Sequence, residues 1–253
     1  MLTDEQLLKY SRQIMLPKID IDGQQKLLDA HIVVLGLGGL GSPVAMYLAS
    51  AGVGRLTLID DDKVDLSNLQ RQIIHKMSAV DLAKVESAKQ TILELAPDCQ
   101  VAVINERLEE SSLSDIVKSA TAVIDCCDNF ETRFMLNRVC HQHQKPLVSG
   151  AAIRWEGQLS TFTMQDDSPC YRCVYEEDVF NDQTCAQNGV AAPLVGIIGS
   201  MQAMEAIKVI TGAGELVSGR LMIFDALDME WRTIKFKKRS DCPVCSGLNR
   251  ISE

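Results

Sequence analysis

The feature that most constrains the fold is a set of closely spaced glycines between two apolar segments. Gly36, Gly38 and Gly41 follow the apolar residues 32–35 at the spacing G-x-G-x-x-G, and residues 42–52 carry apolar side chains at helical spacing. This order predicts a strand, a tight turn and a helix. Glycines let a phosphate approach bare backbone, and the helix N-terminus adds free N–H groups and a positive dipole end. The segment therefore predicts a nucleotide-binding loop, although glycines at this spacing also serve simple strand–helix packing.

A run of three acidic residues follows the next predicted strand. Residues 55–59 are apolar enough for a second buried strand, and Asp60, Asp61 and Asp62 come directly after it. At this point of a strand–helix–strand unit, an acidic side chain usually accepts hydrogen bonds from ribose hydroxyls. The other interpretation, in which the carboxylates only cap a loop, explains one of them better than three. The sequence therefore predicts a nucleotide site.

The remainder of the first half alternates between short apolar runs and amphipathic segments. Lys84 and Lys89 fall outside the apolar face of the amphipathic segment at residues 81–96. Such alternation predicts a doubly wound, mostly parallel α/β sheet, whose ligands gather outside the carboxyl ends of the strands. The glycine-rich loop, Asp60 and Asp128 all fall at such ends. The predicted strands are residues 101–104, 122–124 and 146–150, and the predicted helices are residues 81–96, 115–119 and 131–143.

The second half of the chain has a different pattern. Residues 158–164 alternate like an exposed antiparallel strand, and two runs within residues 221–236 predict a hairpin. Residues 193–210 predict a long apolar helix, whereas residues 176–188 are polar and aperiodic and are expected to form a mobile loop. Because no repeat or linker is recognisable, we expect one continuous domain over residues 1–253, in which antiparallel strands extend the parallel sheet.

The nine cysteines of the chain include two C-x-x-C pairs. Because the cytosol keeps thiols reduced and no export signal is recognisable, a disulfide framework is not expected. Cys170 with Cys173 and Cys242 with Cys245 offer four thiolates, the number that closes a tetrahedral zinc site. A redox dithiol would explain either pair alone but does not predict both. The sequence therefore predicts a structural zinc clamp without a catalytic role, since a closed four-sulfur site has no position for a catalytic water.

Composition and charge narrow the classes of function. Hydrophobic residues make up 46% of the chain and charged residues 23%, as in ordinary globular proteins. No apolar run reaches the roughly 18 residues that span a membrane, and the polar first residues lack the features of a signal peptide. The net charge of −9 argues against binding to a nucleic-acid backbone. We expect a cytoplasmic protein that binds neither membranes nor nucleic acid.

Five segments together resemble the HesA/MoeB/ThiF family, the bacterial relatives of ubiquitin-activating enzymes. The resemblance covers nearly the whole chain and implies a Rossmann-like fold. It also implies ATP-dependent adenylation, with magnesium, of the C-terminal glycine carboxylate of a small ubiquitin-like sulfur-carrier protein ending in Gly-Gly. The segments are the glycine-rich loop at residues 36–41, Ser-Asn-Leu-Gln-Arg-Gln at 67–72, Asp-Asn at 128–129 and the cysteine pairs at 170–173 and 242–245.

The same resemblance implies roles for single residues. Arg12, Arg71 and Lys84 would contact the ATP phosphates, Asp60 the ribose, and Asp128 the magnesium or the reacting phosphate. It also implies a homodimer in which Arg12 reaches the nucleotide of the partner. The chemistry of adenylation agrees with these roles, because a carboxylate that attacks an α-phosphate needs positioning and cations rather than a protein nucleophile. The full predicted nucleotide-binding set is Gly36, Gly38, Gly39, Gly41, Asp60, Asn68, Arg71, Lys84, Asp128 and Asn129.

The residues leave the identity of the carrier open between two pathways. The segments at residues 149–154 and 156–158 look more like the MoeB type, which acts on the small subunit of molybdopterin synthase, and we favour this carrier. Residues 60–62 and the second cysteine pair look more like the ThiF type, which acts on the thiamine sulfur carrier. Cys185 matches a cysteine that links covalently to the carrier in some relatives and is dispensable in others. No sulfurtransferase segment is recognisable after Cys245, so we expect a separate sulfur-donor protein.

Two functions from other classes fit parts of the pattern. An NAD-dependent oxidoreductase explains the glycine-rich loop and Asp60, but it gives no reason for Arg71, Lys84 and the cysteine clamp. A zinc scaffold that only binds a ubiquitin-like partner explains the cysteines and predicts no catalysis. ATP-dependent pyrophosphate exchange would separate the adenylating enzyme from both.

Overall fold

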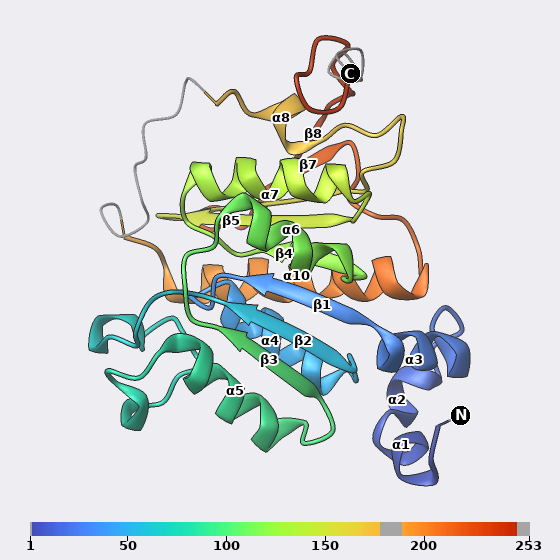
Figure 1. The fold of residues 1–253 in the computed structure, drawn as a ribbon, viewed down its shortest axis with the longest axis vertical. Helices are drawn as coiled ribbons and strands as arrows, with labels where there is room; N and C mark the ends of the chain where they lie inside the picture. Colours follow the sequence, from blue (N-terminus) through green and yellow to red (C-terminus); the bar gives the residue numbers. More distant parts are fainter. Residues whose placement is uncertain (1, 178–188, 247–253) are drawn as a thin grey trace.

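One sheet of eight strands runs through the described chain, which comprises residues 2–177 and 189–246 of a computed structural model (Figure 1). The strand order is β3-β2-β1-β4-β5-β6-β7-β8, in which β1 to β5 pair in parallel and β5 to β8 pair antiparallel. This confirms the predicted fold class, including the antiparallel extension. The strands are β1 (His31–Leu35), β2 (Arg55–Ile59), β3 (Gln100–Ile104), β4 (Ala122–Asp125), β5 (Leu147–Ile153), β6 (Glu156–Phe162), β7 (Arg220–Asp225) and β8 (Glu230–Lys235).

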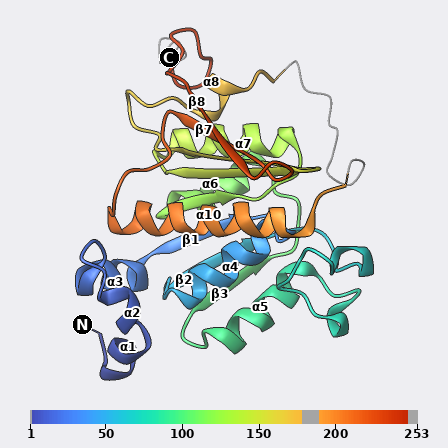
Figure 2. The same cartoon turned by 180° about the vertical axis from the view of Figure 1, so that it is seen from behind.

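Helices cover both faces of the sheet. The α4, α5 and α10 helices pack on one face, which Figure 2 shows from behind, and α6 and α7 pack on the other. The N-terminal helices α1 to α3 gather beside the start of β1 (Figure 1). The helices are α1 (Asp4–Lys9), α2 (Ser11–Ile14), α3 (Asp20–Asp29), α4 (Gly41–Ser50), α5 (Lys84–Leu95), α6 (Glu110–Lys118), α7 (Phe130–Gln142), α8 (Tyr171–Val174) and α10 (Ala192–Thr211), with the 3-10 turns η1 (Leu66–Asn68) and η2 (Met77–Ala79).

The continuous apolar run before the glycines is explained by the position of β1 in the middle of the sheet. All five residues of β1 are buried. Ile32 and Val34 face the core beneath α4, α5 and α10, whereas Val33 and Leu35 face the core beneath α6 and α7. A parallel strand covered on both faces needs apolar side chains on both, so it shows no alternation.

Three details of the sequence prediction are wrong. The helix predicted over residues 115–119 is α6, which begins earlier, at Glu110. The segment predicted as an exposed strand is β6, which is mostly buried because it pairs with both β5 and β7 and packs against α10. The helix predicted over residues 81–96 begins at Lys84, whose side chain is buried although it falls outside the predicted apolar face. Residues 178–188, which include Cys185 and most of the predicted mobile loop, lie outside the described residues.

The long apolar α10 is the one helix of the described residues with the length and hydropathy of a membrane span. Its Leu194, Ile198 and Ala206 are buried in the same core as residues of β1, β4 and β5. The burial of α10 is that of a core helix, and the apolar composition of a core helix also gives it the hydropathy of a membrane span.

Candidate active site

A cavity of about 540 Å³ opens at the carboxyl edge of the parallel strands. The loops after β1, β2 and β4 line it, together with the start of α5 and the end of β5. The sheet thus brings together segments that are far apart in the sequence, at the edge where a doubly wound fold binds its ligands. The predicted site residues that line the cavity are Gly36, Gly38, Gly39, Asp60, Asn68, Arg71, Lys84, Asp128 and Asn129.

Two glycines of the loop are required by close backbone contacts. Gly36 has φ +92°, and a Cβ there would lie 2.6 Å from the carbonyl oxygen of Cys126. Gly41 begins α4 and is not among the residues that line the cavity. A Cβ on Gly41 would lie 1.9 Å from the carbonyl oxygen of Gly36, so its hydrogen side chain allows the loop to fold back on itself.

Asp60 joins the end of β2 to the glycine-rich loop. Its Oδ2 accepts a hydrogen bond of 2.6 Å from the N–H of Leu37, and its Oδ1 accepts one of 2.9 Å from the N–H of Asp62. Burial raises the pKa of Asp60, while the charge of Lys84 and the two backbone N–H groups oppose this shift. Each carboxylate oxygen has two lone pairs, so Asp60 can still accept hydrogen bonds from a ribose.

Two of the predicted phosphate-binding residues, Lys84 and Arg71, bring positive charge to the cavity lining. The Lys84 side chain is 7% exposed, and its Nζ lies 2.7 Å from Oδ2 of Asp62. A buried ammonium needs such a partner, because burial of an unpaired charge is costly. Arg71 follows η1, and its Nη1 donates a 3.1 Å hydrogen bond to the carbonyl oxygen of Ser67. Both side chains belong to the cavity lining beside the glycine-rich loop.

The loop between β4 and α7 brings Asp128 and Asn129 to the cavity lining. Asn129 caps α7, since its side-chain oxygen accepts a 2.9 Å hydrogen bond from the N–H of Thr132. Asp128 is exposed to the cavity, and its Oδ1 lies 3.5 Å from Nδ2 of Asn129. The helix cap therefore fixes the loop while the Asp128 carboxylate stays open to a ligand.

A buried ion pair behind this loop was not found by the sequence analysis. Nη1 of Arg133 lies 3.4 Å from Oδ2 of Asp125, which also accepts a 2.6 Å hydrogen bond from the hydroxyl of Ser149. Nη2 of Arg133 donates to the carbonyl oxygens of Cys127 and Gly150. Burial alone would lower the pKa of Arg133, but its interactions, above all with Asp125, raise it overall. Arg133 thus links the end of β4 and the loop after it to the middle of β5.

Gln72 is a second cavity residue whose position was not predicted from the sequence. Its side chain is buried in the cavity wall, and its amide oxygen has no hydrogen-bond partner among the described residues. Most buried polar side-chain atoms in proteins have a hydrogen-bond partner, from the protein or from ordered water. The sequence feature that could have indicated its place in the cavity is its position next to Arg71 in the Ser-Asn-Leu-Gln-Arg-Gln segment.

Arg12 does not lie with the other predicted phosphate-binding residues. It belongs to α2 and is not among the residues that line the cavity. Figure 1 shows α2 beside the N-terminal start of β1, whereas the cavity lies at the carboxyl end of that strand. Arg12 therefore cannot serve the cavity of its own chain in this arrangement.

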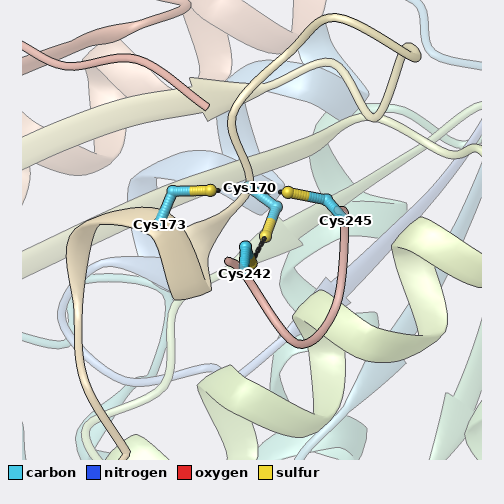
Figure 3. A group of neighbouring side chains, drawn as sticks. All are labelled: Cys170, Cys173, Cys242 and Cys245. Carbon is cyan, nitrogen blue, oxygen red and sulfur yellow. Dashed lines mark hydrogen bonds between the residues drawn. The ribbon is translucent and has the colours of Figure 1, made fainter. Parts of the chain in front are cut away.

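The four predicted zinc ligands form one buried cluster (Figure 3). Their sulfur atoms lie within 4.8 Å of one another, with Sγ–Sγ distances of 3.6 Å for Cys170 and Cys242 and 3.4 Å for Cys173 and Cys245. A tetrahedral site with Zn–S bonds of about 2.3 Å has sulfur–sulfur edges of about 3.8 Å. The cluster therefore fits the predicted zinc clamp.

Further donors support negative charge on these sulfurs. The Asn137 side chain donates to Sγ of Cys170 at 3.6 Å, and the N–H of Arg239 donates to Sγ of Cys173 at 3.5 Å. Such outer contacts orient metal ligands. The four cysteines are not among the described residues that line the cavity. This separation agrees with a structural role for the metal.

The fold and the cavity define an α/β protein of the doubly wound class, with a cavity at the carboxyl edge of its parallel strands and a four-cysteine cluster in its second half. The model of the ThiF family matches residues 10–244. The chain therefore belongs to the ThiF family, which confirms the resemblance found in the sequence.

The chain is similar to known proteins over most of its length. It is 46% identical over 244 residues to the molybdopterin-synthase adenylyltransferase of Escherichia coli (strain K12), covering 96% of this chain and 98% of that protein. It is 43% identical over 248 residues to the sulfur carrier protein ThiS adenylyltransferase of the same organism, covering 98% of each. A crystal structure of E. coli MccB with ATP has a TM-score of 0.79 and 23% identity, covering 88% of this chain and 68% of that chain, and shows the shared fold.

Proposed function

We propose that the protein is an adenylyltransferase that uses ATP to activate the C-terminal glycine carboxylate of a small ubiquitin-like sulfur carrier. The observation that carries the proposal is the convergence of the glycine-rich loop, Arg71, Lys84 and Asp128 on one cavity. Relatives that are 43–46% identical over nearly the whole chain are named as adenylyltransferases. The cavity thus combines a nucleotide site with the cations that phosphoryl chemistry needs.

The reaction requires no covalent bond to the protein. An oxygen of the glycine carboxylate attacks the α-phosphorus of ATP, the bond from this phosphorus to the bridging oxygen breaks, and pyrophosphate leaves with the electron pair. The carboxylate and ATP are both anions, and pyrophosphate departs as a third, so fixed positive charge stabilises the transition state. Lys84 and Arg71 supply this charge, and the buried position of Lys84 keeps its ammonium beside the glycine-rich loop.

The other roles follow the positions in the cavity. Asp60 binds the ribose, the N–H groups of the loop approach the phosphates, and Asn68 and Asn129 supply further polar contacts. Asp128 would hold magnesium, since an exposed carboxylate is a typical oxygen ligand for it. Magnesium bound there would neutralise phosphate charge.

The carrier that we propose is the small subunit of molybdopterin synthase, with the thiamine sulfur carrier as the alternative. The relative named for molybdopterin synthase is 46% identical and the one named for ThiS is 43% identical, which agrees with the preference drawn from the sequence. Sulfur would come from a separate donor protein. We place the enzyme in the cytoplasm. We treat residues 1–253 as one adenylyltransferase domain, because the eight-stranded sheet joins both halves of the chain.

We further propose a homodimer in which Arg12 reaches the nucleotide of the second copy. Arg12 lies away from the cavity of its own chain, so a role at the phosphates requires a partner. Exposed apolar side chains on the outer surfaces of α4 and α10, namely Tyr47, Ile197 and Met204, offer a surface for such contact. Cys185 lies outside the described residues, and its covalent link to the carrier stays a proposal.

Two lysines of the same helix test the proposal. Lys84→Met should lower ATP–pyrophosphate exchange about 100-fold or more, because it removes a charge that stabilises the transition state. Lys89→Met is the control, since Lys89 also belongs to α5 but is not among the residues that line the cavity. The proposal fails if Lys84→Met retains normal exchange, or if the two variants lose exchange equally while both stay folded.

A further inference from the structure

The His75 side chain joins three segments that line the cavity. Its Nε2 lies 3.0 Å from the carbonyl oxygen of Leu37 in the glycine-rich loop. Its Nδ1 lies 2.9 Å from the hydroxyl oxygen of Ser87 in α5, the helix that begins with Lys84. His75 itself follows shortly after the segment at residues 67–72, which carries Arg71, and the His75 side chain is buried. One side chain therefore connects the glycine-rich loop to the segments that carry Arg71 and Lys84.

The partners of His75 define the protonation of its ring. A carbonyl oxygen only accepts hydrogen bonds, so Nε2 carries the hydrogen and donates it to Leu37, and in the neutral ring Nδ1 accepts from the Ser87 hydroxyl. Burial lowers the pKa of His75, the hydrogen bond with Leu37 raises it, and the charge of Lys84 lowers it further. The lowered pKa favours the neutral ring, which satisfies both contacts.

These contacts hold Leu37 from two sides. Its N–H donates to Oδ2 of Asp60 at 2.6 Å, and its carbonyl oxygen accepts from His75. The carbonyl of Leu37 and the N–H of Gly38 belong to one planar peptide unit and point in opposite directions. The hydrogen bond from His75 therefore sets the direction of the Gly38 N–H, in a loop whose glycines would otherwise leave the peptide free to rotate. Gly38 lines the cavity.

We propose that His75 is a positioning residue that holds the glycine-rich loop in the conformation that binds the ATP phosphates. It acts through the Leu37 carbonyl and does not touch the nucleotide itself. This inference rests on the proposed function, because it takes the ligand of the loop to be ATP. It predicts that loss of the contact with Leu37 weakens ATP binding, whereas loss of the contact with Ser87 alone has a smaller effect.

Two amide variants separate the contacts of His75. In His75→Gln the side-chain nitrogen takes the place of Nε2 and keeps the bond to Leu37. In His75→Asn the shorter amide reaches only Ser87 and leaves the Leu37 carbonyl unpaired. The matched control is His31→Leu, since His31 is also buried, with Nε2 2.8 Å from Oγ1 of Thr57, but stands at the start of β1, at the opposite end from the cavity.

The experiment measures ATP affinity by calorimetric titration without the carrier, together with the unfolding midpoint of each variant. We expect His75→Asn and His75→Leu to weaken ATP binding about tenfold, and His75→Gln to stay within about twofold of the wild type. The KM for ATP should rise more than kcat falls. His31→Leu should lower the unfolding midpoint without weakening ATP binding.

Unchanged ATP affinity in both His75→Asn and His75→Leu would overturn the positioning role. Equal weakening by His75→Leu and His31→Leu would also overturn it, because it would show a general loss of stability instead. A wild-type protein that binds no ATP would overturn the proposed function itself. The failures of the two proposals are therefore distinguishable.

Discussion

Replacement of Arg133 by methionine should destabilise the protein strongly, because it leaves a buried carboxylate without its cation. The side chains of Arg133 and Asp125 are 9% and 0% exposed. Removal of one partner of a buried ion pair typically costs about 3–5 kcal/mol. For a chain of this length, such a loss corresponds to a fall in the unfolding midpoint of roughly 10 °C. Ser149 and the N–H of Cys127 still donate to Asp125, and they keep the loss from being larger.

A double-mutant cycle with Asp125→Asn measures the interaction itself. Urea unfolding followed by circular dichroism gives the free energy of unfolding for each single variant and for the double variant. We expect the double variant to be more stable than the sum of the single effects by about 1 kcal/mol or more. The exposed pair Arg107 and Glu131 provides the control, since Arg107→Met should cost less than about 1 kcal/mol. Additive effects, or a loss for Arg133→Met no larger than for Arg107→Met, would refute the reasoning.

Three further predictions concern the metal, the glycine-rich loop and the pH dependence of stability. Cys242→Ser should lower both the zinc content, measured by elemental analysis, and the unfolding midpoint, because metal binding to a closed site adds folding free energy; an unchanged midpoint would contradict a clamp. Gly41→Ala should unfold at markedly lower urea, since its Cβ would lie 1.9 Å from a carbonyl oxygen, whereas Gly196→Ala, which meets nothing within 4 Å, should be as stable as the wild type or more so. Burial lowers the pKa of His31 and His75 from the ordinary 6.5, so protonation favours the unfolded chain, and the free energy of unfolding should fall between pH 7 and pH 5. Equal slopes for the wild type and a His31→Gln, His75→Gln variant would contradict this assignment.

Local patterns predicted the parts of the structure that depend on nearby residues. The apolar run of β1, the glycine spacing and the two C-x-x-C pairs each involve a few neighbouring positions, so strand, loop and metal cluster could be predicted before the fold was known. The carboxyl edge of the sheet then followed from strand–helix alternation alone.

The charged residues that the fold buries could not be predicted in the same way. Helical periodicity placed Lys84 outside the apolar face, but Asp62 from another segment provides the partner that allows its burial. Arg133 lies on α7, where a charged side chain usually faces solvent, and its pairing with Asp125 exists only in three dimensions. The buried position of His75 could not be predicted either, because its two hydrogen-bond partners stand on other segments of the chain.

The most direct test of the central claim is the mass of the carrier after incubation with the protein, ATP and magnesium. Intact-protein mass spectrometry should show that the small subunit of molybdopterin synthase, or the thiamine sulfur carrier, gains one AMP, with release of one pyrophosphate. A carrier that lacks its terminal glycine should gain none. Absence of the AMP adduct on both intact carriers, with folded protein that binds ATP, would contradict adenylation of a sulfur carrier.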